Sequence, residues 1–234
     1  MENDKEMQNT DPLIRTKLRL PFTRTELVAR PRLKLRFAEG LRGPLTLITA
    51  PAGFADCEML VAWLSLDSGD NQAGRFLNYL IEALINADGM VRREAIQLLS
   101  ASQEVPFEVV LTSLINDLDA AGGEIALVLD DYQFISSQAV HTAVAFLLEH
   151  GPKTLHLVIA ARSDPPLPLA KLRARGQVVE LRTSDLRFTV SKSTQFLNEV
   201  MGFRLSASAV AMLEERTEGW IADLEEAVNS LGNF

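Results

Sequence analysis

Three uninterrupted apolar runs, each followed by polar residues, constrain the fold more than any other feature of this sequence. They lie at 45–49, 125–129 and 155–161. Strands that are apolar at every position are buried on both faces, which is typical of a parallel sheet covered by helices. A further strand is predicted at 61–66, and apolar residues recur at helical spacing over 76–85 and 109–118. The second of these helices is expected to start at Pro106 and to stop near Gly122. We therefore predict an α/β fold with a mostly parallel sheet and helices on both of its faces.

The ends of the chain differ from this pattern. Residues 15–36 hold eight Lys or Arg against the single acid Glu26, so the net charge of −8 divides into +7 for this segment and −15 for the rest. After about residue 186 only helices are predicted, at 194–201, 206–218 and 221–231, with Ser206 as a cap. We expect a disordered leader at 1–14, a basic arm at 15–40, the α/β core at 41–185 and a small all-helical lid at 186–234.

Two readings of the basic arm remain open. It contacts the phosphates of a nucleotide or nucleic acid, or it lies as a solvated segment across the acidic core. No apolar run approaches the roughly 18 residues of a membrane span, and the polar start lacks the apolar core of a secretory signal. The single cysteine excludes an internal disulfide. We expect a cytoplasmic protein with no membrane partner.

A degenerate phosphate-loop sequence follows the first apolar run. Loops of the form G-x-x-x-x-G-K-[ST] bind phosphates with backbone N–H groups and a lysine, and hold magnesium with a hydroxyl. Residues 50–57 read A-P-A-G-F-A-D-C, with Ala55 in place of the second glycine, Asp56 in place of the lysine and Cys57 in place of the hydroxyl residue. The frame predicts a phosphate-loop NTPase ancestry, whereas the substitutions argue against turnover.

Two further signals come from the ends of the later strands. Asp130 and Asp131 follow the run at 125–129, and Arg162 follows the run at 155–161. Because parallel strands end at one edge of a sheet, these side chains are expected beside the phosphate loop. There Asp130 would orient magnesium, Asp131 would polarise water, and Arg162 would contact a terminal phosphate. The alternatives are ordinary polar residues where a buried strand meets water, and a surface arginine in a turn.

Six segments in matching order resemble the N-terminal ATPase module of the large LuxR-type transcriptional regulators of the maltotriose-activator kind, a group of the signal-transduction ATPases with numerous domains (STAND). The segments are L-V-A-R-P-R-L at 27–33, T-A-P-A-G-F at 49–54, W-L-S-L-D-S-G-D-N at 63–71, L-V-L-D-D-Y at 127–132, R-S-D-P-P-L-P-L at 162–169 and E-G-W-I-A at 218–222. The likeness extends from about residue 14 to residue 231.

The resemblance implies a switch between ADP- and ATP-bound states that controls oligomerisation and transcription. By position it implies that Val28 and Arg30 contact the base, and that Ala52, Gly53 and Phe54 form the phosphate loop together with Ala55, Asp56 and Cys57. It also implies an acidic strand end at Asp130 and Asp131, with Asp130 at the magnesium. Arg162 is the implied phosphate sensor. The implied cofactor is ATP or ADP with Mg²⁺, and the implied partners are further regulator subunits or a second copy of the chain. The family's winged-helix region, sensor repeats and DNA-binding helix-turn-helix are not in this chain, so we expect no direct DNA binding.

Two departures from the family shape the functional hypothesis. The G-K-[ST] residues are replaced, and the loop is separated from the next strand by about ten residues fewer than in the family, so either the loop's helix is shortened or the strand is displaced. We therefore expect a degenerate regulatory ATPase module that acts as a nucleotide-switch remnant or a protein-interaction module, with ATP/ADP binding weakened or lost, and we leave open whether it is an enzyme. The alternatives are a slow ATPase that uses Asp131 with Arg162, and a binder of ATP or ADP without hydrolysis.

Overall fold

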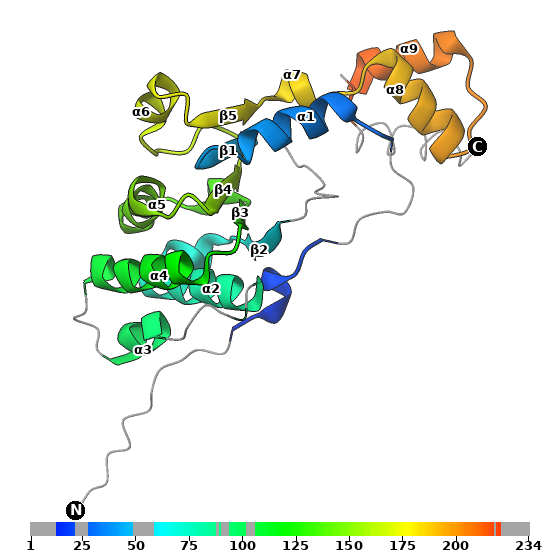
Figure 1. The fold of residues 1–234 in the computed structure, drawn as a ribbon. Helices are drawn as coiled ribbons and strands as arrows, with labels where there is room; N and C mark the ends of the chain where they lie inside the picture. The colour runs from blue at the N-terminus through cyan, green and yellow to red at the C-terminus, as the bar shows by residue number, and fades with distance from the viewer. Residues whose placement is uncertain are drawn as a thin grey trace, which may run out of the picture. The chain divides into compact units, whose positions relative to one another are not determined.

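The computed structural model describes residues 13–21, 28–48, 59–87, 89, 94–101, 106–217 and 219–220 of the 234-residue chain. The chain divides into two compact units (Figure 1). The first consists of Met1–Pro21 and Phe37–Glu180, and the second of Phe22–Arg36 and Leu181–Phe234. The chain thus leaves the first unit after residue 21, contributes a short segment to the second, and then returns.

A five-stranded parallel sheet is the basis of the first unit. Its strands are β1 (Leu45–Ile48), β2 (Leu60–Ser65), β3 (Ile125–Asp130), β4 (Leu155–Ala160) and β5 (Val178–Leu181), in the spatial order β2-β3-β4-β1-β5. All of β1 and β4, and β3 up to its last residue, are buried. The predicted α/β class and the four predicted strands are confirmed. The sequence analysis missed β5, a four-residue strand with three half-buried positions, because it is too short to show a clear pattern.

The two faces of the sheet follow from the alternation of side chains along each strand. Leu47, Leu127 and Leu157 contribute to one large core with the helices on their side. Thr46, Val128 and His156 are also buried but face the other way. The acidic residue that ends β3 lies on this second face, because it is an even number of positions from Val128.

Helices cover the large core. They are α2 (Ala73–Ala87), α3 (Glu94–Ala101), α4 (Phe107–Ala121), α5 (Gln138–His150) and α6 (Leu169–Ala174), and three short 3-10 turns lie at η1 (Arg15–Leu18), η2 (Ser68–Asn71) and η3 (Tyr132–Phe134). Helix α4 begins after Pro106 and ends at Gly122, whose φ of 70° lies in the left-handed region that glycine adopts readily. The predicted bounds of α4 are therefore confirmed by its capping residues.

Part of the segment expected to be a basic arm is helical. Residues Pro31–Gly40 form α1, with the proline at its first position, where the missing N–H costs nothing. At the other end, Gly40 lies so close to β1 that an added Cβ would be 2.3 Å from Thr46 Oγ1. The sequence analysis missed this helix because charged and apolar residues alternate over 32–37, which is not a helical spacing.

The second unit is a small helical body with its own core. Its elements are α7 (Thr183–Leu186), α8 (Val190–Gln195), which continues as one π-helical turn η4 (Phe196–Val200), and α9 (Ala207–Thr217). The core contains Val28, Phe188, Phe196, Leu197, Val210 and Leu213. Ser206 Oγ accepts a hydrogen bond from the N–H of Ala209 at 3.3 Å, which is the expected cap of α9. The predicted helix at 221–231 lies outside the described residues.

Within the described residues, no helix combines the length and the apolar character that crossing a bilayer requires.

Candidate functional site

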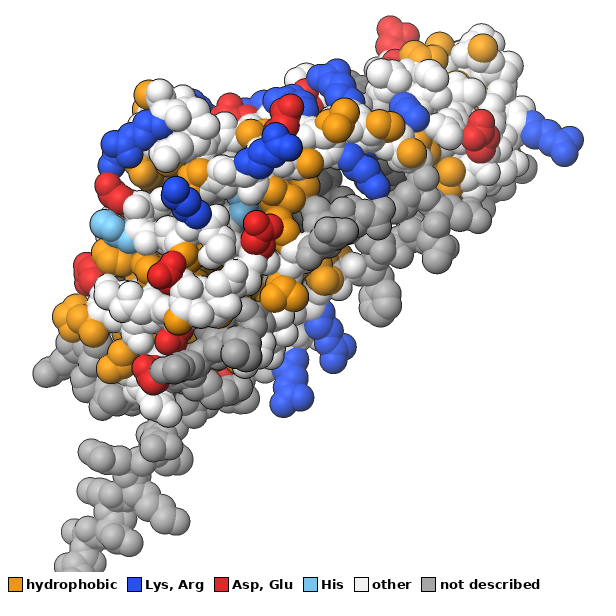
Figure 2. Space-filling view, in the orientation of Figure 1, with side chains coloured by type: hydrophobic (Ala, Val, Ile, Leu, Met, Phe, Trp, Pro, Cys, Tyr) orange, Lys and Arg blue, Asp and Glu red, His pale blue; other side chains and the backbone are white. Residues whose placement is uncertain are grey.

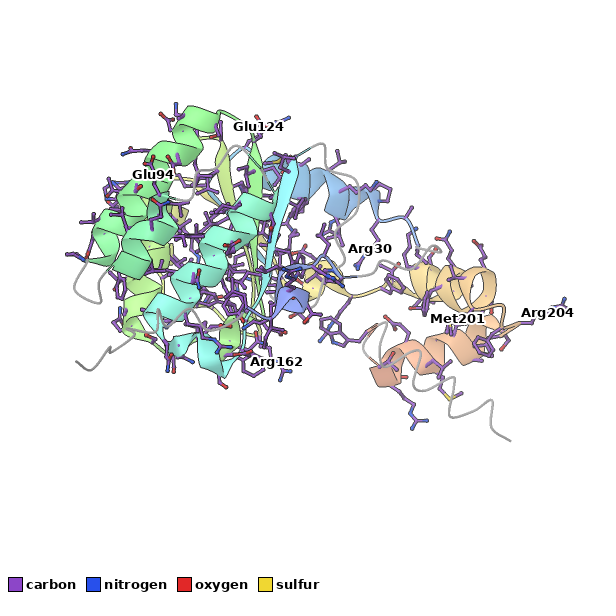
Figure 3. All side chains as sticks on the ribbon, turned by 90° about the horizontal axis from the view of Figure 1, so that it is seen from below. Arg30, Glu94, Glu124, Arg162, Met201 and Arg204 are labelled. Atoms are coloured by element: carbon purple, nitrogen blue, oxygen red, sulfur yellow. The ribbon has the colours of Figure 1, made fainter. Side chains whose placement is uncertain are left out.

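The acidic end of β3 and the arginine that follows β4 lie at the same edge of the sheet. Leu129 pairs with Ile159, so Asp130 is level with Ala160, and Arg162 follows two residues later on the neighbouring strand. Ile48, the last residue of β1, also pairs with Ala160. Figure 3 shows Arg162 at this end of the strands and Glu124, which precedes β3, at the other. The structure therefore brings Asp130, Asp131 and Arg162 to one edge.

The two acidic residues have different environments. Asp130 is half-buried, and burial together with the adjacent charge of Asp131 raises the pKa of its carboxyl group. One of its oxygens, Oδ1, accepts the N–H of Asp131 at 3.0 Å. Asp131 is exposed, has a φ of 57°, and accepts a hydrogen bond at Oδ1 from Gln133 Nε2 at 2.7 Å. The pair thus uses part of its hydrogen-bonding capacity on its own turn.

A salt-bridge network supports the loop that carries Arg162. Arg173 in α6 contacts Asp164 and Glu180, each at 2.6 Å from its Nη2. These hydrogen bonds raise the pKa of the Arg173 guanidinium. The side chain of Arg162 itself is exposed. Sequence reasoning did not find Arg173, because its partners are 9 and 7 residues away along the chain and only the tertiary fold brings them together.

The degenerate phosphate loop lies outside the described residues, and with it Ala52, Gly53, Phe54, Ala55, Asp56 and Cys57. The strands on either side of it are described. β1 ends at Ile48 and β2 begins at Leu60, and β2 pairs with β3 along its whole length.

The residues expected near a base belong to the second unit. Val28 is part of its apolar core. The Arg30 guanidinium donates to the carbonyl oxygens of Asp185, Leu186 and Arg187 at 3.1, 2.5 and 3.2 Å, and lies 5.1 Å from the centre of the Phe188 ring. Burial lowers the pKa of Arg30. These carbonyls are at the end of α7, so Arg30 satisfies groups that the helix leaves unpaired.

Other basic residues of the N-terminal segment also have partners within the chain. Arg32 and Arg36 contact Asp185 at 2.8 and 2.5 Å. Burial acts to raise the pKa of Asp185, but a backbone hydrogen bond and these two cations outweigh it, so the pKa is lowered. On the face drawn in Figure 2, Lys and Arg side chains are interspersed with Asp and Glu over most of the surface. The described residues form no extended patch of one sign on that face.

Sequence reasoning missed two polar clusters beside the acidic pair. The buried hydroxyl of Tyr132, the residue after Asp131, shares a hydrogen bond with His141 Nδ1 at 2.9 Å. Burial lowers the pKa of His141. The second cluster surrounds Lys17, which is buried against η2. The W-L-S-L-D-S-G-D-N segment at 63–71 signals the second cluster, but its partner lies about fifty residues earlier.

No group of three or more His, Cys, Asp or Glu side chains in the described part of the chain is arranged to hold a metal ion.

Comparison with known proteins gives consistent matches. The chain is 32% identical over 222 residues to the HTH-type transcriptional regulator MalT of Yersinia pestis (strain Pestoides F) and 33% identical over 224 residues to that of Serratia proteamaculans (strain 568). Each match covers 91% of this chain and 25% of the relative, so the chain spans about a quarter of their length. No family model matches. The matches confirm the resemblance to the large LuxR-type regulators.

Proposed function

We propose that this chain, similar over 91% of its length to MalT-type transcriptional regulators, is a regulatory module of such a regulator in which nucleotide binding is weakened or lost. Its role would be to contact other regulator subunits or a second copy of itself, in the cytoplasm. The observation that carries the proposal is the short connection between β1 and β2. The replaced phosphate-loop residues support it independently.

The length of the connection can be compared with the distance that it spans. Ile48 is level with Ser65, because Ile48 pairs with Ala160 and Ser65 pairs with Asp130. Leu60 therefore lies three strand spacings across the sheet from Ile48 and five residues further back along β2. The straight-line distance between the two residues is roughly 22 Å. A connection that carries a helix must also leave the face of the sheet by a helix diameter of about 10 Å and come back to it. Its path then becomes roughly 40 Å long. Twelve Cα-to-Cα steps reach about 40 Å when fully extended.

A full phosphate-loop helix does not fit within this reach, because each helical residue advances the chain by only about 1.5 Å. The N-terminal turn of that helix is what presents backbone N–H groups and a positive dipole to phosphate. The charge at the loop is also reversed. Two opposite unit charges about 4 Å apart attract by roughly 4 kcal/mol at an effective dielectric constant of 20, and Asp56 replaces that attraction with repulsion. A micromolar affinity corresponds to only about 8 kcal/mol.

The described residues fit a magnesium polyphosphate only in part. Asp130, Asp131 and Arg162 are the residue types that a bound nucleotide with Mg²⁺ would use. However, Asp130 Oδ1 already accepts the N–H of Asp131, and Asp131 Oδ1 accepts Gln133 Nε2, so only part of their oxygen atoms is left for a metal. We therefore assign no catalytic step to these residues. Their shared edge is the observation that favours the second candidate, a slow ATPase or an ATP or ADP binder.

Isothermal titration calorimetry with ADP and with ATP, each with Mg²⁺, tests the proposal. We expect no measurable heat at nucleotide concentrations up to about 1 mM, which corresponds to binding weaker than about 4 kcal/mol. Binding in the micromolar range refutes the proposal, and phosphate release in addition supports the slow ATPase.

A variant with Ala55→Gly, Asp56→Lys and Cys57→Thr separates the two causes. Restored binding in this variant would mean that charge and residue type alone abolish the site. If the variant still does not bind, the length of the β1–β2 connection is the decisive defect. Arg204→Met, a change at an exposed position in the second unit, is a control for nonspecific effects of a changed charge.

A further inference from the structure

An N-terminal segment of the first unit is attached through a buried ion cluster. We call residues 13–21 the N-terminal clasp. Lys17 in the clasp is buried, and its Nζ contacts Asp67 Oδ2 at 3.0 Å and Asp70 Oδ2 at shorter range. The ammonium group lies 4.6 Å from the centre of the Tyr79 ring, and the Tyr79 hydroxyl accepts the N–H of Ile14 at 3.0 Å. Lysine is almost never buried unless it is paired, so this pairing is what permits the clasp to dock here.

The carboxylates that receive Lys17 also shape the turn after β2. Asp67 Oδ1 accepts the N–H of Gly69 at 2.7 Å, and Asp70 Oδ2 accepts the N–H of Asp67 at 2.8 Å, which together form the capping box of η2. Lys17 binds the same Oδ2 atom of Asp70 that closes this box. The hydrogen bond to Lys17 lowers the pKa of Asp67. The position of η2 therefore depends on the clasp.

Asn71, which follows Asp70 and ends η2, connects η2 to the segment that follows the acidic end of β3. Asn71 Oδ1 accepts the N–H groups of Ser136 and Ser137 at 2.7 and 2.8 Å, and its Nδ2 donates to the carbonyl of Phe134 at 2.9 Å. This segment begins at Asp131, whose φ of 57° is an uncommon conformation for a residue other than glycine. Such a conformation persists only where its surroundings hold it.

We propose that Lys17 is a positioning residue: through Asp70 and Asn71, the docked clasp holds residues 131–137, and with them the acidic edge of the sheet, in one conformation. The clasp is followed directly by residues 22–36, which belong to the second unit. The device links the clasp to the acidic edge, and it does not depend on whether a nucleotide binds.

Amide hydrogen exchange of the full chain tests this inference without any nucleotide. In Lys17→Met, we expect the amides of Ser136 and Ser137 to exchange about tenfold faster or more, whereas amides of β1 and β4 change by less than about twofold. Lys17→Arg keeps the charge and should restore most of the protection. Lys171→Met, which removes an exposed lysine paired with Glu149, is the matched control and should leave Ser136 and Ser137 unchanged.

Asn71→Ala and a milder cluster variant complete the test. Asn71→Ala should expose the same two amides, and adding Lys17→Met to it should change them little, because both act along one route. If Lys17→Met does not fold, Asp67→Asn, at a half-exposed side chain, should give a smaller acceleration at the same amides. Unchanged exchange at Ser136 and Ser137, equal acceleration throughout the first unit, or full additivity with Asn71→Ala would overturn the proposal.

Discussion

Replacing Gly40 with alanine is expected to destabilise the first unit strongly, although the change adds a single methyl group. The new Cβ would lie 2.3 Å from Thr46 Oγ1 and 3.3 Å from Val179 Cβ. Thr46 cannot move away easily, because its side chain is fully buried in β1 and its hydroxyl is 3.0 Å from His156 Nε2. The His156 ring is fixed in turn by the carbonyl of Gly43, to which Nδ1–H donates.

The expected magnitude follows from these contacts. Forcing a methyl group into a packed site costs about 1–3 kcal/mol. Displacing the Thr46 hydroxyl leaves the buried Nε2 of His156 without a partner, which adds about 1–3 kcal/mol. We therefore expect Gly40→Ala to lower the free energy of unfolding by about 2–6 kcal/mol. With a urea m-value of about 2–3 kcal/mol/M, the midpoint falls by about 1–3 M.

Urea unfolding followed by circular dichroism measures this change, with two comparison variants. Gly74→Ala in α2 is the matched control, because an added Cβ there meets no atom within 4 Å, and its stability should be unchanged or slightly higher. Thr46→Ala removes the obstructing hydroxyl, so Gly40→Ala should cost much less in that background than alone. The reasoning is refuted if Gly40→Ala lies within about 0.5 kcal/mol of the parent chain, or if Gly74→Ala is equally destabilising.

Three further predictions concern buried polar groups. Burial lowers the pKa of His156 in the folded state, and its backbone hydrogen bond partly opposes this shift. Below pH about 6.5 the unfolded chain therefore binds more protons than the folded chain, so the urea midpoint should be constant above that pH and fall below it. The fall should be less steep in His156→Gln. Arg30→Met should lower the free energy of unfolding of the second unit by about 1–3 kcal/mol, measured in urea, because three carbonyls lose their donor. Arg204→Met, which changes the projecting side chain labelled in Figure 3, is the control and should not alter the urea midpoint. Tyr132→Phe should lower the free energy of unfolding by about 1–3 kcal/mol in urea, because the buried Nδ1 of His141 loses its hydrogen-bond partner, and an unchanged midpoint would contradict this.

Local sequence patterns predicted the elements that are buried throughout. The apolar runs that became β1, β3 and β4 are unambiguous because both faces of these strands are covered. Proline and glycine marked the ends of α4, because one lacks an N–H and the other adopts positive φ without strain. Elements at the margins were missed: charged and apolar residues alternate in α1 instead of following a helical spacing, and β5 is half-buried at three of its four positions.

Among the candidate site residues, the sequence predicted that Asp130, Asp131 and Arg162 would share an edge, since parallel strands end together. It could not predict that Arg30 would bind carbonyls near residue 186, or that Lys17 would be buried against η2. These contacts join residues about 155 and 50 positions apart, and no local pattern encodes such a distance. Charge in the sequence indicated basic residues but not their partners.

The sequence by itself determined the parallel α/β class, the presence of Ala55, Asp56 and Cys57 after the first strand, and the eleven residues between β1 and β2, because each of these is a property of residue type and order. The tertiary structure decided the strand order β2-β3-β4-β1-β5, and with it the distance that those eleven residues must span. It also decided which charges are buried together. Removing a lysine or an aspartate from water costs free energy, and this cost is offset only where folding supplies an opposite charge at contact distance.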